Sequence, residues 1–364
     1  MKKILLILGV CALIFTSCDK EKAVNFTKIA DMLYEVTYDT YSEKPVGTYQ
    51  EFGGEMACSC VRNGNYVGRN FDYYMNRSAI FVVHTTAKKG RYASIGIARL
   101  SNVNNAIIEA GLSDRQIKIL PWGLVDGMNE KGLVVTANVV AKLDAGTIPH
   151  TGTNPGAPEL NIHSAIRALI DNCASVQEAI NYLESHNITP FGSEKTNLHL
   201  MVSDPKETYV VEIINNQIVA RPQNIMTNYH LFLNEIPDYA MGVERYNILQ
   251  EHYDEGGENM EGMWNLMKRV RYTNSYLAEN KWYSEIAPLF GIPYSEIASH
   301  QSILDNYLIS QEEEWMVEKA YIEQDGLREE TEWWDTAHNS IYNIRDKKLW
   351  VTLHEQNIIH KFSL

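Results

Sequence analysis

One stretch of fifteen residues, Cys58 to Asp72, constrains this chain most, because it has the pattern of a tight β-hairpin. Asn-Gly is the strongest short hairpin signal, since both central residues of a type I′ turn need positive φ. Counting outward from a turn at Asn63-Gly64 pairs Cys58 with Arg69, and directly opposed residues lie about 5 Å apart on one face. The hairpin therefore predicts a thiol beside a guanidinium, which lowers a thiol's pKa.

The two cysteines of the first strand allow other interpretations. A cysteine in an apolar strand is usually a small buried hydrophobe. Cys58 and Cys60 point the same way, so a disulfide between them would be strained. A metal pair would need a second Cys or His pair at zinc spacing, and the sequence has none. The predicted register of Cys58 against Arg69 selects Cys58, and not Cys60, as a nucleophile.

Cys-Ser-x-Val at 58–61, followed by Gly-Arg-Asn-Phe-Asp at 68–72, resembles the active-site start of the choloylglycine hydrolase and linear amide C–N hydrolase family. These N-terminal-nucleophile (Ntn) hydrolases include bile-salt hydrolases, penicillin V acylases and acid-ceramidase-like enzymes. The resemblance implies an α+β fold, the αββα sandwich of two antiparallel sheets with outer helices. It also implies that Cys58 becomes the first residue of the mature chain.

Four further segments resemble the family in the same order along the chain. Residues 127–133, followed by Asn138, are similar to its second signature, 226–228 to its Thr-Asn element, 243–246 to its later Arg element, and 331–342 to its C-terminal sheet. The site that the resemblance implies consists of Cys58, Arg69, Asp72, Asn138, Asn228 and Arg245.

Taken singly, these positions have simpler explanations. Asn129 suits a turn because asparagine tolerates the left-handed region. Asn228 suits a cap or turn after a strand, and Arg245 suits a solvated helix face. Their joint occurrence in the family's order favours the site.

The resemblance gives each residue a role. A thiol must lose its proton to attack an amide carbonyl, and a free α-amine on Cys58, with a pKa of about 7.7–8, can take that proton near neutral pH. Asp72 would orient the amine and Arg69 would favour the thiolate. Asn228, with Asn138, would donate to the oxyanion, a role worth about 3–4 kcal/mol per donor. Arg245 would organise Cys58 and Asp72 from the opposite side, and neither metal nor cofactor is expected.

Composition excludes some partners. The formal charge of −14 over 364 residues, with no basic block, argues against nucleic acid and anionic membrane surfaces. The expected partner is a small-molecule N-acyl amide substrate, and a homo-oligomer is left open.

The N-terminus predicts export. Residues 1–17 combine Lys2-Lys3, an apolar run and small residues, as in a signal peptide. Cys18 follows directly, as in a bacterial lipoprotein, and the alternative is an ordinary secretory signal with an incidental cysteine. We expect a lipid anchor on Cys18, a periplasmic or cell-surface location, a tether and propeptide-like segment over 18–57, and a catalytic domain over 58–364.

Periodicity predicts the remaining elements. Ile29 to Val36 has helical spacing, so part of the pre-segment should pack on the body. Ile162 to Glu184 predicts one long helix whose apolar stripe contains Cys173. A turn is expected over 126–132. Strands are expected over 79–84, 92–97, 133–138, 198–202, 209–214, 340–344 and 349–354, and helices over 243–252, 260–271 and 310–318.

These observations favour an exported hydrolase with a cysteine nucleophile that cleaves linear N-acyl amides, such as conjugated bile salts or fatty N-acyl amides. Two alternatives stay open. One is an N-acyltransferase on the same fold, which passes the acyl group to an amine instead of water. The other is a non-catalytic surface lipoprotein that binds a ligand.

Overall fold

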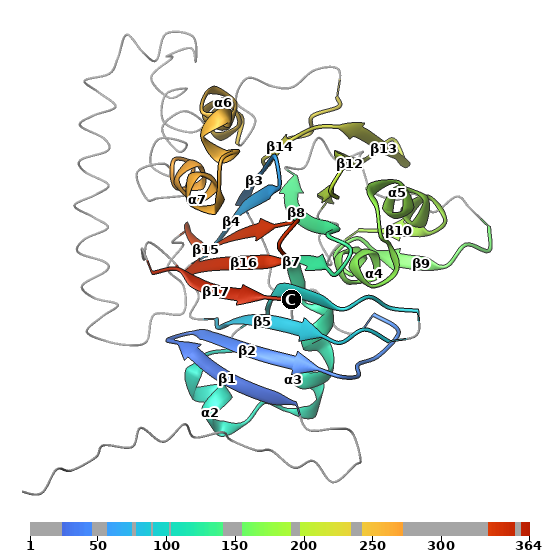
Figure 1. Ribbon diagram of the computed structural model, residues 1–364. Helices are drawn as coiled ribbons and strands as arrows, with labels where there is room; N and C mark the ends of the chain where they lie inside the picture. The colour runs from blue at the N-terminus through green and yellow to red at the C-terminus, as the bar shows by residue number, and fades with distance from the viewer. Residues whose placement is uncertain are drawn as a thin grey trace, which may run out of the picture.

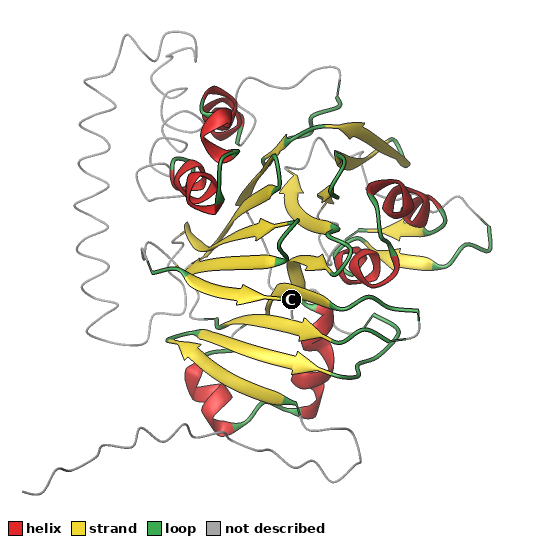
Figure 2. Cartoon of the chain, in the orientation of Figure 1, coloured by secondary structure: helices red, strands yellow, loops and turns green. Residues whose placement is uncertain are grey.

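A computed structural model gives the fold (Figures 1 and 2). It describes residues 24–45, 57–74, 78–88, 90–101, 103–140, 155–190, 197–233, 242–271, 334–353 and 358–364. The signal peptide, Cys18 and the helix expected over 310–318 lie outside these residues.

A nine-stranded sheet forms one layer. It is antiparallel except where β2 pairs in parallel with β5. In spatial order its strands are β1 (Asn25–Ala30), β2 (Leu33–Tyr38), β5 (Ile80–Thr85), β6 (Ser94–Arg99), β7 (Leu124–Asn129), β8 (Val134–Val140), β11 (Asn197–Ser203), β12 (Thr208–Ile214) and β13 (Gln217–Pro222).

A six-stranded antiparallel sheet forms the second layer and carries the cysteine hairpin. Its spatial order is β14 (Ile225–Met226), β3 (Ala57–Asn63), β4 (Tyr66–Tyr74), β15 (Trp334–Asn343), β16 (Lys348–Leu353) and β17 (His360–Ser363). The strands expected over 340–344 and 349–354 are confirmed up to Asn343 in β15 and up to Leu353 in β16, and residue 354 lies outside the described residues. They pair through Ser340 and Val351.

Helices cover the outer faces of both sheets (Figure 1). α4 (Ala165–Asn172) and α5 (Val176–Glu184) pack on the nine-stranded sheet, whereas α6 (Val243–Glu251) and α7 (Met260–Lys268) pack on the six-stranded sheet. The predicted αββα sandwich is therefore confirmed. The shorter elements are α2 (Asn105–Ala110), α3 (Asp114–Ile119), the 3₁₀ turns η1 (Leu120–Trp122) and η2 (Tyr253–Gly256), and the parallel pair β9 (Glu159–Asn161) and β10 (Asn187–Thr189).

The same Gly-x-Asn device docks a helix on each sheet. A Cβ on Gly68 would lie 2.7 Å from the Met267 side chain in α7, so only glycine lets β4 and α7 approach this closely. Two residues later, the Asn70 side-chain amide donates to the carbonyls of Met267 and Val270, at 2.9 and 3.1 Å. These carbonyls close the C-terminal end of α7, where helical carbonyls lack partners.

The second copy of the device lies on β7. A Cβ on Gly127 would lie 3.0 Å from Ile170 in α4. The Asn129 amide donates to the carbonyls of Ile170 and Cys173, at 2.9 and 2.8 Å. Asn129 Oδ1 also accepts the backbone N–H groups of Lys131 and Leu133, at 3.0 Å each. Asn129 therefore fastens the turn and the helix end together.

The helix expected over Ile29 to Val36 is wrong. The segment forms the β1–β2 hairpin, which turns at Met32 with φ 56°. Four side chains of β2 are buried, because this strand lies against β5 inside the sheet: Leu33, Tyr34, Val36 and Tyr38. Apolar residues three and four positions apart occur in a hairpin as well as in a helix. The pairing of β2 with the distant strand β5 favours the hairpin. The expectation that the pre-segment packs on the body is confirmed.

The single helix expected over Ile162 to Glu184 is two helices. Cys173 is extended, with φ −114° and ψ 139°, and Asn129 holds its carbonyl. Ser175 then starts α5, because its side chain accepts the Glu178 N–H. Cys173 is buried in the core, as expected.

The turn expected over 126–132 is mostly strand. β7 continues through Asn129, and the tight turn is confined to the residues before Leu133, where Gly132 has φ 86°. The strands expected over 79–84, 92–97, 133–138, 198–202 and 209–214 are confirmed, as are the helices over 243–252 and 260–271, with ends that shift by a few residues. Within the described residues, no helix is long and apolar enough to cross a membrane.

Candidate active site

The cysteine hairpin forms, but its register differs from the prediction by two residues. Asn63 pairs with Tyr66, so the loop is Gly64-Asn65, with φ 58° at Gly64. Glycine first in a two-residue loop is typical of a type II′ turn. Asn63, which was predicted to lie in the turn, is the last residue of β3. Its side chain donates to the Tyr253 carbonyl at 2.7 Å, which fastens the hairpin to η2.

The shifted register corrects the argument for the nucleophile. Cys60, and not Cys58, lies directly opposite Arg69, and Cys58 lies opposite Phe71. All four side chains share the inner face of the sheet, because alternate residues of a strand point the same way. Arg69 reaches diagonally, and its Nη2 lies 3.3 Å from the Cys58 Sγ. The thiol–guanidinium contact is therefore present although the predicted pairing is wrong.

The sulfur of Cys58 lies between the two sheets. Arg69 donates to the Ala137 carbonyl at 2.6 Å and to Asp126 Oδ2 at 2.7 Å. Asp126 belongs to β7 of the opposite sheet, and the side chains of Cys58, Arg69 and Asp126 are fully buried. An Arg–carboxylate pair thus crosses the interior directly beside the thiol.

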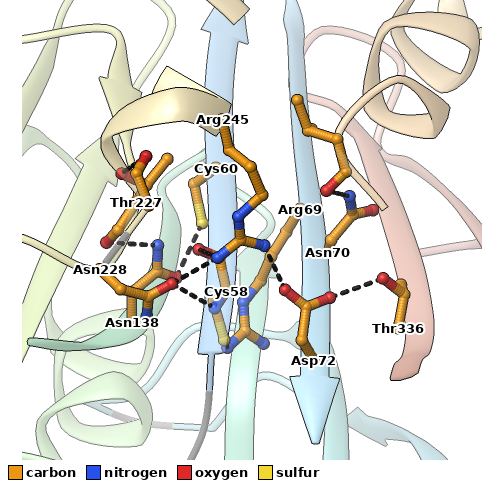
Figure 3. A network of polar contacts seen from close by, with 12 residues as sticks. Cys58, Cys60, Arg69, Asn70, Asp72, Asn138, Thr227, Asn228, Arg245 and Thr336 are labelled. Atoms are coloured by element: carbon orange, nitrogen blue, oxygen red, sulfur yellow. Dashed lines mark hydrogen bonds and ion pairs between the residues drawn. The ribbon is translucent and has the colours of Figure 1, made fainter. Parts of the chain in front are cut away.

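The backbone of Cys58 is held by a second set of residues (Figure 3). Its N–H donates to Asn228 Oδ1 at 2.8 Å, and its carbonyl accepts from Arg245 Nη2 at 3.2 Å. The same Nη2 donates to Asn228 Oδ1 at 2.6 Å. Asn228 Nδ2 donates to the Val139 carbonyl at 2.7 Å. Asn228 Oδ1 therefore accepts hydrogen bonds from both the Cys58 nitrogen and the Arg245 guanidinium.

Asp72 completes this second set. Its Oδ2 pairs with Arg245 Nη1, and its Oδ1 accepts from Thr336 Oγ1 at 2.6 Å. Asp72 and Arg245 are both buried. In Figure 3 the Arg245 guanidinium lies between Asn228 on one side and Asp72 on the other. A buried ion pair keeps its charges only when hydrogen bonds satisfy both partners, and Thr336 contributes one of these bonds.

Strand pairing explains why Asn228 lies here. β14 runs beside β3, with Ile225 opposite Val61 and Met226 opposite Cys60. Two residues further along, Asn228 meets Cys58. A buried cluster on the other sheet fastens this segment: His199 Nε2 donates to the Thr227 carbonyl at 2.6 Å, and Glu212 accepts the backbone N–H groups of Leu231 and Phe232 at 2.8 and 3.2 Å.

Asn138 lies beside Cys60 and not beside Cys58. Its Oδ1 accepts from the Cys60 Sγ at 3.2 Å, and Thr136 donates to the same sulfur at 3.2 Å. Its Nδ2 donates to the carbonyls of Met226 and Thr227, at 3.2 Å each. The structure therefore brings Cys58 together with all the expected site residues except Asn138, which joins β14 to Cys60.

Burial overturns the expected pKa of the thiol. It raises the pKa of Cys58 to about 11, because loss of solvent outweighs the lowering effect of Arg69. Burial likewise raises the pKa of Cys60 to about 12. In the chain described here, where Cys58 still follows Ala57 in β3, the thiol is the stable form at neutral pH.

Sequence reasoning missed three polar residues of the site. Asp126 was assigned to a turn, and Thr336 and Tyr342 were seen only as parts of C-terminal strands. A buried arginine needs a buried counter-charge, so the prediction of Arg69 and Arg245 in one interior already required a second carboxylate beside Asp72. Among the described residues, no cluster of three or more His, Cys, Asp or Glu side chains is arranged to hold a metal.

Comparisons with known proteins place the chain in a family. The model of the acyl-coenzyme A:6-aminopenicillanic acid acyl-transferase family matches residues 61–281. No curated protein matches. A mutant of conjugated bile acid hydrolase from Clostridium perfringens is similar in structure, with a TM-score of 0.44 and 17% identity over 85% of this chain and 92% of that chain.

Penicillin V acylase from Agrobacterium tumefaciens is also similar, with a TM-score of 0.40 and 15% identity over 84% of this chain and 86% of that chain. The family model spans more than half of the 364 residues. The chain therefore belongs to the acyl-coenzyme A:6-aminopenicillanic acid acyl-transferase family and, as its motifs indicated, to the Ntn hydrolases.

Proposed function

We propose that this protein cleaves the C–N bond of a linear N-acyl amide, with Cys58 as the nucleophile. One observation carries the proposal: Arg69 holds the Cys58 sulfur while Asn228 and Arg245 hold its nitrogen and carbonyl. A structural cysteine needs no such contacts. Both ends of the residue are positioned, as an enzyme requires when one residue supplies nucleophile and base.

The α-amine is the proposed base. In the described chain the Cys58 nitrogen belongs to a peptide bond and donates to Asn228. Cleavage between Ala57 and Cys58 would leave an amine at the same place, with a pKa of about 7.7–8 and able to take the thiol proton. Asp72 and Arg245 keep the neighbouring charges balanced. The Cys58 thiolate then attacks the carbonyl, and the amine returns the proton to the leaving nitrogen.

We assign oxyanion stabilisation to Asn228. Its Nδ2 donates to the Val139 carbonyl in this structure, and a side-chain amide has a second hydrogen that would donate to the oxyanion of the substrate. Asn138 has its Nδ2 on the carbonyls of Met226 and Thr227, so its role is to hold the segment that carries Asn228. Water then hydrolyses the thioester on Cys58.

Acyl transfer to an amine is the second candidate, because the matching family model describes an acyl-transferase. Purified protein would be given conjugated bile salts, N-acyl amino acids, ceramides and penicillin V, with and without an added amine, and its products identified by mass spectrometry. Free acid in both conditions indicates hydrolysis, and a new amide formed only with the amine indicates transfer. Turnover that persists in Cys58→Ser would refute the cysteine nucleophile.

Cleavage has a separate test. Intact-mass analysis of active protein should show a catalytic chain that begins at Cys58. An active species that still runs through Ala57 into Cys58 would refute the free-amine mechanism.

Export and lipidation are proposed from residues 1–17 and Cys18. Labelling with a palmitate analogue should mark the wild-type chain and not Cys18→Ala. A wild-type chain that is exported but takes up no label would argue for an ordinary secretory signal, and a labelled Cys18→Ala variant would show that the lipid is carried elsewhere.

A further inference from the structure

Asp126 pairs with the same Arg69 guanidinium that contacts the Cys58 thiol, and several donors hold its carboxylate. Its Oδ2 accepts from Arg69 at 2.7 Å and from Ser340 Oγ at 3.3 Å, and its Oδ1 accepts from the Tyr342 hydroxyl. Ser340 and Tyr342 lie two residues apart on β15, so both point inward from the six-stranded sheet. All four side chains are buried.

Arg69 is therefore shared between an anion and a thiol. Nη1 donates to Asp126 and Nη2 lies on the Cys58 sulfur. A unit negative charge at 2.7 Å from the guanidinium cancels much of the potential that Arg69 exerts on the sulfur, because screening by solvent is weak in the interior. The strength of the pair thus decides how much positive charge the sulfur experiences.

We infer that Asp126 is a positioning residue that withholds part of the charge of Arg69 from Cys58, and that the Tyr342 hydroxyl sets how much is withheld. The inference rests on the proposed role of Cys58 as the nucleophile. A donated hydrogen bond draws the charge of Asp126 toward Tyr342 and away from Arg69. Loss of Asp126 and loss of the Tyr342 hydroxyl must therefore act on the thiol in opposite directions.

Two buried histidines lie near this ion pair: His163 interacts electrostatically with Arg69, and His338 Nε2 lies 3.6 Å from Asp126 Oδ2. Neither titrates near neutral pH. Burial lowers the pKa of His163 to about 3 and that of His338 to about 4, so both rings are neutral there. On the other side of Cys58, Asp72 is paired with Arg245. Within the described part of the chain, the other titratable groups that interact with Arg69, Asp126 or His338 are Cys60 on β3, Arg99 on β6 and Tyr342 on β15. The Cys58 α-amine joins them once the chain is cut.

Alkylation of Cys58 by iodoacetamide tests the inference without any substrate, since only the thiolate reacts. Fragment mass spectrometry would follow the label on Cys58 separately from Cys60, in full-length folded protein across a range of pH. Asp126→Asn should move the alkylation midpoint to lower pH, which gives about tenfold faster labelling below the midpoint for each pKa unit.

Tyr342→Phe should move the midpoint to higher pH and slow the labelling at the same pH. Tyr38→Phe is the matched control, because it removes a buried hydroxyl that donates to the Ile117 carbonyl at 2.8 Å, away from Asp126. It should lower stability and leave the midpoint unchanged. The midpoint, unlike the absolute rate, is insensitive to how readily the reagent reaches the sulfur.

Opposite shifts in the two variants support the inference. Unchanged midpoints, or shifts of the same sign, overturn it. If Asp126→Asn does not fold, Tyr342→Phe decides alone, since only a shift to higher pH agrees with charge sharing. Activity that persists in Cys58→Ser would refute the proposed function, and the alkylation profile would still report how Asp126 acts on the thiol.

Discussion

The two sheets dock their helices with the same three-residue device and differ in the residue at its centre. Gly68-Arg69-Asn70 fastens α7 to one sheet, and Gly127-Met128-Asn129 fastens α4 to the other. In each, glycine admits the helix and asparagine closes the helix end. The central side chain points into the interior, where Met128 packs in the core and Arg69 meets Cys58.

The comparison separates scaffold from chemistry within one motif. The asparagine of Gly-Arg-Asn looks like a site residue in the sequence, since it lies next to Arg69. Its counterpart makes the same pair of bonds beside a methionine. Asn70 therefore has a structural role. Of the three positions, only the central one differs in chemistry between the two segments, with Arg69 beside the Cys58 thiol and Met128 in the core.

The largest effect is expected from Arg69→Met, which makes the two devices alike. Turnover should fall by about 10³-fold or more, because the thiolate loses the cation that contacts it. The variant should also lose about 3–5 kcal/mol of stability, because Asp126 is left as a buried charge without its ion-pair partner. Kinetics and thermal melting measure the two losses.

The double variant Arg69→Met/Asp126→Asn should recover stability without activity. Recovery of both would show that Arg69 serves the fold alone.

The next largest effect is expected from Asp72→Asn, on β4 two residues beyond the device. The protein should stay folded by near-UV circular dichroism but with reduced stability, because Arg245 is left as a buried charge without its ion-pair partner. Turnover should fall by about 10²–10³-fold, because Arg245 and the Cys58 nitrogen lose their balancing charge. Thr336→Val is the control, since it removes only a hydroxyl donor to Asp72. If Asp72→Asn unfolds the protein, the residue is structural and its catalytic role fails.

A moderate effect is expected from Asn70→Ala and Asn129→Ala. Each removes the amide that two carbonyls at a helix end share, so each should lower the free energy of unfolding by about 1–3 kcal/mol. Denaturant unfolding should give a somewhat larger loss for Asn129→Ala, because Asn129 Oδ1 also accepts the N–H groups of Lys131 and Leu133. A much larger loss of turnover in Asn70→Ala than in Asn129→Ala, at a temperature where both are folded, would contradict the scaffold role.

The smallest effect is expected from Cys60→Ala. Its thiol faces Arg69 across the hairpin, yet it is bonded to Asn138 and Thr136, and its backbone pairs with Met226 as an ordinary part of the sheet. Turnover should be largely retained, with about 1 kcal/mol of stability lost. A loss equal to that of Cys58→Ser would show that both thiols take part in the reaction.

The sequence predicted the strands and the composition of the site better than the local geometry. Apolar runs such as Ile80–Thr85 and Thr208–Ile214 have one dominant interpretation, because a buried strand needs continuous apolar residues. The order of motifs brought Asn228 and Arg245 to Cys58, although neither contact can be derived from spacing.

The failures share one physical cause: a local pattern that fits two structures is decided by a distant partner. Asn63-Gly64-Asn65 can turn at either pair of residues, and the contact of Asn63 with Tyr253 favours the second. Asp126 looked like a turn residue because a buried carboxylate in a strand is rare without a charged partner on another element. Arg69 is that partner.

The parallel pairing of β2 with β5 has a consequence for the unfolding and refolding of the enzyme. If the bond before Cys58 is cut, β2 belongs to a separate polypeptide, although it still fills the interior with Leu33 and Val36. The uncut chain can refold in a unimolecular step, whereas the cut enzyme can refold only after the polypeptide that carries β2 has associated with the catalytic chain again. Its melting temperature should then rise with protein concentration, and dilute molecules that open should not recover, so persistence depends on how slowly they open.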